Sequence, residues 1–250
     1  MVGRLASGIL VLAVVTLSAA LVVRTNWIRT KISALSLPPL TDYADANRRL
    51  PPKSQKPRLV LIGDSRIALW PASAMDDRFE VINRGIGGET SAQMARRFDR
   101  DAIALKPDVI VIQSGINDLV AATFMDKAAR RSVIRQTSET LIRLANAGSA
   151  SGARVLLTTI IPVARPELLR LPVWNDSLRA GVAEVNDKLR RSALPDRASL
   201  IDLSAALSAG DDRLLLDEFR LDALHLNQTG YDRLTDRVLQ SLPASLPSSR

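Results

Sequence analysis

The 250-residue chain is long enough for one sizeable α/β domain and an additional segment, and its 46% hydrophobic and 24% charged residues are typical of globular proteins. With no cysteine and a single histidine, a cysteine nucleophile, disulfides and a zinc site with several histidine ligands are excluded, whereas a metal site made of carboxylates alone is not. Most of the net charge of +8 comes from residues 1–58, where nine Lys/Arg face two Asp, so we expect no nucleic-acid-binding face on the folded part.

An uncharged, apolar run of 19 residues, Leu5–Val23, lies at the N-terminus. As a helix it would extend about 28 Å at about 1.5 Å per residue, close to the thickness of a bilayer core. Arginine flanks the run on both sides, and Trp27 lies where an interfacial aromatic residue is expected. We therefore predict a transmembrane signal anchor over residues 1–24. A secretory signal cleaved near residues 18–20 and a buried soluble helix are the alternatives.

The charges around this run give opposite predictions for the side of the membrane on which the next domain lies. Arg24, Arg29 and Lys31 outnumber Arg4 and the amino terminus, and this bias favours a cytoplasmic domain. A short N-terminal tail before a single anchor favours export instead. We predict a membrane-anchored, single-pass protein with an extracytoplasmic, periplasmic catalytic domain.

Residues 25–57 form a basic, proline-rich stretch, with five prolines among residues 36–57. Because proline resists both helix and strand, we predict an extended linker that holds the domain away from the bilayer. Its basic residues can attract anionic lipid head groups.

Residues 58–242 are predicted to form the catalytic domain, with a C-terminal tail over residues 243–250. Short apolar runs alternate there with helical patterns, which is typical of βαβ units around a parallel sheet. The predicted strands are Leu59–Ile62, Glu80–Ile82, Val109–Gln113, Arg154–Thr158 and Leu200–Leu203. Four helices are predicted from helical spacing of apolar residues. The first contains Met94, Phe98 and Leu105, and the second contains Ile134, Leu141 and Leu144 and stops at Gly148. The third runs from Leu178 to Leu189, and the fourth follows Gly230. Ligands of such sheets bind at the carboxyl ends of the strands.

Polar segments follow the first two predicted strands. In Gly63–Arg66, a serine on a tight turn between strand and helix can expose its hydroxyl, although Asp and Ser are also ordinary helix caps. Asn83–Ser91 is rich in glycine, and the Gly88 N–H can point at a ligand, with a structural turn as the plain alternative. Neither a dinucleotide fingerprint nor a phosphate loop fits that segment.

Two further segments carry an amide, a carboxylate and an imidazole. Asn117 follows the third strand, where its side chain can donate to a developing oxyanion or simply form an Asx turn or helix cap. Asp222 and His225 are three residues apart, which places them on one side of a single turn. In that arrangement the imidazole accepts a hydroxyl proton while the carboxylate holds its other N–H. Each signal is weak alone, but together they indicate one catalytic edge of the sheet.

On these residues the predicted domain resembles the SGNH hydrolases, also called GDSL lipases and esterases. The resemblance implies a three-layer α/β/α, flavodoxin-like sandwich around a five-stranded parallel sheet. It also implies that Ser65 is the nucleophile, with Asp222 and His225 completing a catalytic triad. By the same resemblance, the oxyanion hole would consist of the Ser65 and Gly88 N–H groups and the Asn117 side chain. No metal or other cofactor is expected.

One departure is Arg66, where the namesake motif of the family has leucine. Arg66 either forms an ion pair with Asp64 or a neighbouring acid, or recognises an anionic substrate. Residues 119–125 and 160–174 carry apolar side chains that suit an acyl pocket and equally suit an ordinary core. The candidate substrate-binding residues are Arg66, Leu119, Leu171 and Trp174.

The expected activity is that of a serine esterase, which hydrolyses carboxylic esters through an acyl-enzyme on Ser65. Lysophospholipids, short-chain acyl esters and acetylated glycans are the substrate classes considered. An O-acyltransferase acting on a glycan and an inactive binding module of the same fold are the alternatives. The expected partners are the ester substrate and the membrane, and no nucleic acid.

Overall fold

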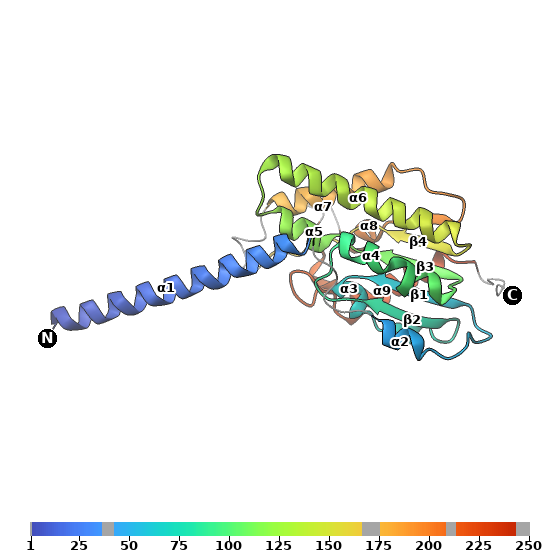
Figure 1. Ribbon diagram of the computed structural model, residues 1–250, viewed down its shortest axis with the longest axis horizontal. Coiled ribbons are helices and arrows are strands. Elements are labelled where there is room, and N and C mark those ends of the chain that lie inside the picture. The colour runs from blue at the N-terminus through green and yellow to red at the C-terminus, as the bar shows by residue number, and fades with distance from the viewer. Residues whose placement is uncertain (1, 37–42, 167–175, 209–213, 244–250) are drawn as a thin grey trace.

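The computed structural model describes residues 2–36, 43–166, 176–208 and 214–243, and its centre is a five-stranded parallel sheet (Figure 1). The strand order is β2-β1-β3-β4-β5, the flavodoxin-like order in which successive strands are added first on one side of β1 and then, from β3 onward, on the other. The strands are β1 (Arg58–Gly63), β2 (Glu80–Gly85), β3 (Val109–Gln113), β4 (Arg154–Thr158) and β5 (Ala198–Ile201). Helices cover both faces of this sheet, so the predicted three-layer α/β/α sandwich is confirmed.

The central strands β1 and β3 are buried along their whole length, and their side chains alternate between two hydrophobic cores. Val60 and Ile62 enter the core that lies under α4, α5, α6 and α7, whereas Leu59 and Leu61 enter the core under α3, α8 and α9. The helices of the first face are α4 (Ser91–Asp101), α5 (Ile116–Ala122), α6 (Lys127–Ala150) and α7 (Asp176–Arg190). Those of the second are α3 (Ser65–Ala68), α8 (Leu203–Leu207) and α9 (Gln228–Gln240), and short 3₁₀ helices lie at Ala72–Met75, Ile103–Leu105 and Asp217–Phe219.

Two predicted boundaries were wrong for local reasons. The fifth strand ends at Ile201 and not at Leu203, because the Asp202 side chain accepts the Ala205 N–H and caps α8. Gly148 does not end its helix, which continues to Ala150. It packs so closely on β4 that an added Cβ would lie 2.8 Å from Val155 Cγ2.

The N-terminal apolar run is one long helix, α1 (Val2–Ser33), which projects away from the domain (Figure 1). It continues past the predicted end of the anchor at residue 24 and reaches the domain near α5. Its part from Ile9 to Ser33 is long and apolar enough to cross a membrane, and the large apolar side chains from Ile9 to Val23 are exposed.

The extended spacer predicted over residues 25–57 was wrong for residues 43–50, which fold onto the domain. A short helix, α2 (Ala44–Arg48), lies beside α4. The Tyr43 hydroxyl donates to the Gly85 carbonyl at 2.6 Å, and the Asn47 amide donates to Asp101 at 2.8 Å. Local proline content did not reveal these contacts because their partners lie more than 40 residues away along the chain.

Candidate active site

The serine segment forms the sharp turn between β1 and α3. Ser65 is the first residue of α3, and the preceding Asp64 caps the helix by accepting the Arg66 N–H at 2.9 Å. Gly63 is required for this turn, because an added Cβ would lie only 1.8 Å from the Gln113 carbonyl oxygen of β3. The turn leaves the Ser65 hydroxyl at the carboxyl edge of the sheet.

His225 reaches the same edge from the turn before α9. Its Nε2 lies 3.0 Å from Ser65 Oγ, and its Nδ1 lies 2.9 Å from Asp222 Oδ2. The other carboxylate oxygen of Asp222 accepts the backbone N–H groups of Leu224 at 2.7 Å and His225 at 2.8 Å. The residues predicted to form a hydroxyl–imidazole–carboxylate chain therefore meet in that order.

The Asp222 carboxylate is held in its ionised form. Burial raises its pKa, but the hydrogen bonds from the His225 ring and from two backbone N–H groups outweigh burial and lower the pKa to about 2. An ionised carboxylate at Nδ1 keeps the proton of a neutral imidazole on that nitrogen. Nε2 is then free to accept a proton from the serine hydroxyl.

The predicted oxyanion donors are the Ser65 and Gly88 N–H groups and the Asn117 side chain. Gly88 has a left-handed backbone (φ 78°), and an added Cβ would meet no atom within 4 Å. Within the described part of the chain, neither the Ser65 N–H nor the Gly88 N–H has a hydrogen-bond acceptor. Asn117, near the start of α5 and 6% exposed, donates one Nδ2 hydrogen to the Glu89 carbonyl at 3.0 Å, which leaves its second amide hydrogen available.

Residues 45–233 match the model of the GDSL-like lipase/acylhydrolase family. The chain belongs to this family. Among curated proteins it is 24% identical to an acetylxylan esterase from Xylanibacter ruminicola over 186 residues, 67% of this chain and 36% of that protein. The chain thus spans about a third of the length of this curated relative.

Solved structures give the same result for the fold of this GDSL-family chain. A GDSL-like lipase from Bacteroides thetaiotaomicron superposes with a TM-score of 0.66 at 26% identity, with 80% of this chain and 94% of that chain covered. An acetylxylan esterase from Geobacillus stearothermophilus, solved as a catalytic mutant, superposes with a TM-score of 0.60 at 20% identity, with 80% and 100% covered.

Arg66, the departure from the leucine of the GDSL motif, does not reach the substrate side. Its side chain is 1% exposed and donates to the carbonyl oxygens of Leu224 at 3.0 Å, Ile161 at 2.7 Å and Pro162 at 3.2 Å. Its prediction as a substrate-binding residue was therefore wrong. Because Leu224 directly precedes His225, the guanidinium ties the serine helix to the histidine turn.

The other predicted substrate-binding residues do not form a described pocket. Leu119 is 2% exposed and packs in the core of the first face, so its prediction as a substrate contact was wrong. The segment that follows Asn117 continues as helix α5, which turns the Leu119 side chain inward. Leu171 and Trp174 lie outside the described residues.

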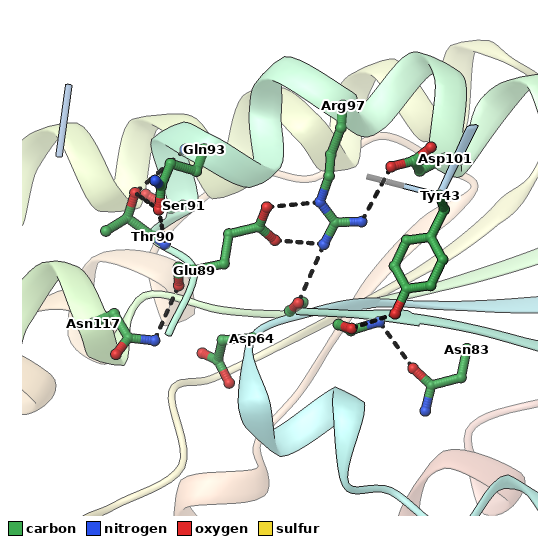
Figure 2. Close-up of polar contacts among 12 residues, drawn as sticks. Tyr43, Asp64, Asn83, Glu89, Thr90, Ser91, Gln93, Arg97, Asp101 and Asn117 are labelled. Carbon is green, nitrogen blue, oxygen red and sulfur yellow. Dashed lines mark hydrogen bonds and ion pairs between the residues drawn. The ribbon is translucent and has the colours of Figure 1, made fainter. Parts of the chain in front are cut away.

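Sequence reasoning missed a buried polar network beside Asn117, one of the predicted oxyanion donors (Figure 2). Glu89 and Arg97 form a double hydrogen-bonded ion pair, and Arg97 also contacts the carboxylate of Asp101 at 3.5 Å. Asp118 accepts the Ser91 N–H at 2.8 Å and its hydroxyl at 2.6 Å, which fixes the glycine-rich loop against α5. In the sequence, only the Glu-Thr-Ser and Asn-Asp segments pointed to this network. Ion pairs between separate helices and loops leave no periodic pattern along the chain.

Burial dominates the charges of this network. It raises the pKa of Asp118 to about 6, and it also raises the pKa of Glu89 against the opposing attraction of Arg97. The described residues include no group of three or more His, Asp or Glu that could hold a metal ion.

Proposed function

We propose that the chain is a serine esterase that hydrolyses carboxylic esters through an acyl-enzyme on Ser65. The observation that carries this proposal is the unbroken chain of contacts from Ser65 Oγ to His225 Nε2, at 3.0 Å, and from His225 Nδ1 to Asp222, at 2.9 Å. His225 removes the hydroxyl proton as Ser65 attacks the ester carbonyl, and Asp222 stabilises the imidazolium that forms. His225 then protonates the leaving alcohol, and water attacks the acyl-enzyme by the same path in reverse.

The oxyanion of each tetrahedral intermediate is bound by the Ser65 and Gly88 N–H groups and by the free amide hydrogen of Asn117. The hydrogen bond from Asn117 to the Glu89 carbonyl fixes that amide, and a donor fixed in advance needs little reorganisation in the transition state. Membership of an acylhydrolase family supports the assignment of this chemistry to these residues.

Helix α1 anchors the enzyme in a membrane with the site close to the bilayer surface and outside the cytoplasm. Its large apolar side chains between Ile9 and Val23 are more than half exposed, which is costly in water and favourable in lipid. Lys31, where the helix meets the domain, comes only eight positions after Val23, about 12 Å along a helix. Arg24 and Arg29 then lie level with anionic lipid head groups.

Acetyl esters of an envelope glycan are the substrates to test first. The named activity of two relatives, acetylxylan esterase, supports a short acyl group on a carbohydrate. Lysophospholipids, which the membrane anchor would also place near the site, form the second set of substrates.

The test is hydrolysis of p-nitrophenyl acetate by the full chain in detergent. Ser65→Ala should lower kcat by roughly 10⁴–10⁶ and abolish labelling by a fluorophosphonate. Ser73→Ala removes an exposed serine and is the matched control, which should hydrolyse and label as the wild type does. Absence of wild-type turnover and labelling would overturn the esterase. Acyl transfer to an added sugar in preference to water would instead identify a transferase.

A further inference from the structure

The last turns of α1 dock beside the proposed oxyanion hole. The Trp27 ring packs edge-on against Phe124, just after α5, with ring centroids 5.5 Å apart. Lys31, one turn later, places its Nζ 3.5 Å from Asn117 Oδ1 and 5.8 Å from the centroid of the Trp27 ring. The helix that carries the membrane segment therefore also contacts a residue of the site.

Two further contacts tie the residues after α1 to the loop and helix that follow β2. The Thr90 hydroxyl donates to the Ala34 carbonyl at 3.1 Å, and Arg96 donates to the Ser36 carbonyl at 3.0 Å. Thr90 immediately follows Glu89, whose carbonyl accepts the Asn117 amide. The end of α1 is thus held to Asn117 and to the residue that follows Glu89.

We propose that Lys31 is a positioning residue for the oxyanion hole and acts through Asn117. An ammonium group can only donate hydrogen bonds, so its contact requires the oxygen of the Asn117 amide to face α1. The amide nitrogen must then face the opposite way, with one hydrogen on the Glu89 carbonyl and the other available to donate to an oxyanion. A cation on the amide oxygen also withdraws electron density from the N–H groups, which makes them stronger donors to a developing oxyanion.

The charge of Lys31 has no other evident use within the described parts of the chain. None of the ion pairs there includes Lys31, and its side chain is partly buried against Trp27. A favourable interaction with the C-terminal dipole of α1 is a purely structural alternative. Arg29 lies on the same last turns, is exposed, and would share such a dipole effect without touching Asn117.

The experiment compares four variants of the full chain in detergent, with p-nitrophenyl acetate as substrate. Lys31→Met keeps the aliphatic stem against Trp27 but removes the charge, and we expect kcat to fall roughly tenfold with KM changed by less than about twofold. Lys31→Arg, which keeps a cationic donor, should recover most of the lost kcat. Arg29→Met should match the wild type, and Asn117→Ala, which removes the donor itself, should lower kcat by roughly 10²–10³.

A double-variant cycle separates positioning from a structural effect. If Lys31 acts through Asn117, Lys31→Met should cause no further loss of kcat in the Asn117→Ala background. Losses that multiply in the double variant, or a wild-type kcat in Lys31→Met, would overturn the inference. The inference rests on the proposed esterase activity, and the two can fail separately: an inactive wild type refutes the esterase, whereas an active wild type with an inactive Ser65→Ala and a fully active Lys31→Met refutes only the role of Lys31.

Discussion

The His225 side and the Asn117 side of the candidate site differ in how far their charged groups are removed from water. On the His225 side, the side chains of His225 and Asp222 are 25% and 33% exposed and are held mainly by one short turn. On the Asn117 side, Glu89 and Arg97 are each 1% exposed and join α4 to the loop after β2. The first side is local and solvated, whereas the second is buried and assembled from several elements.

This difference fits the proposed reaction. The imidazole must gain and lose a proton in each half-reaction, and partial exposure limits the cost of its transient charge. The oxyanion donors must keep one position while charge develops on the substrate, and a buried, hydrogen-bonded support prevents their reorientation. Damage to the first side should therefore reduce turnover and preserve stability, whereas damage to the second should reduce stability.

Of the variants that compare the two sides, Asp222→Asn is expected to have the largest effect on turnover without unfolding the protein. The asparagine oxygen can still accept the backbone N–H groups of Leu224 and His225, so the turn should persist. Its NH₂ group would then face His225 Nδ1 and force the proton onto Nε2, which could no longer accept the Ser65 proton. We expect kcat for p-nitrophenyl acetate to fall by about 10⁴ with an unchanged thermal midpoint. A variant with wild-type kcat would remove Asp222 from the reaction.

On the buried side, Arg97→Met should lower the free energy of unfolding by about 3–5 kcal/mol, because it leaves Glu89 as an unpaired buried charge. Urea titration of the detergent-solubilised chain would measure this loss. The double variant Glu89→Gln with Arg97→Met is the matched control and should recover part of the stability, since it removes both charges. If Arg97→Met were as stable as the wild type, the contrast between the two sides would not hold.

Sequence reasoning succeeded where a structural feature depends on residues that are close along the chain. The apolar runs of β1 and β3 predicted buried strands, and the three-residue spacing of Asp222 and His225 predicted their contact. The remaining interactions join distant segments. Lys31 meets Asn117 across 86 residues, and Arg66 meets the Leu224 carbonyl across 158 residues. No periodicity or spacing rule reports such contacts, because they depend on how the finished layers pack. Arg66 was accordingly predicted to pair with an acid or to recognise the substrate, although it supports the histidine turn.

The smallest expected effect concerns Asp64, which lies between the two sides under Ser65. The side chain is fully buried, one of its oxygens has no partner within the described chain, and burial raises its pKa to about 6 despite the attraction of Arg66. The folded protein then binds this proton more tightly than the unfolded chain, whose Asp has a pKa near 3.9. The contribution of Asp64 to the free energy of unfolding is therefore fully present below about pH 4 and is lost as the pH rises through about 6.

Asp64→Asn should test this directly, because its amide is neutral at every pH and its oxygen can still accept the Arg66 N–H. The unfolding free energy of the variant relative to the wild type should increase by about 1 kcal/mol between pH 5 and pH 8. Urea titrations at the two pH values measure the difference, and Asp126→Asn, which removes the exposed cap of α6, provides the control. A difference between Asp64→Asn and the wild type that does not vary with pH would mean that Asp64 is already ionised at pH 5. Solvation would then extend beneath Ser65, and the boundary between the exposed and buried sides would lie deeper than the structure places it.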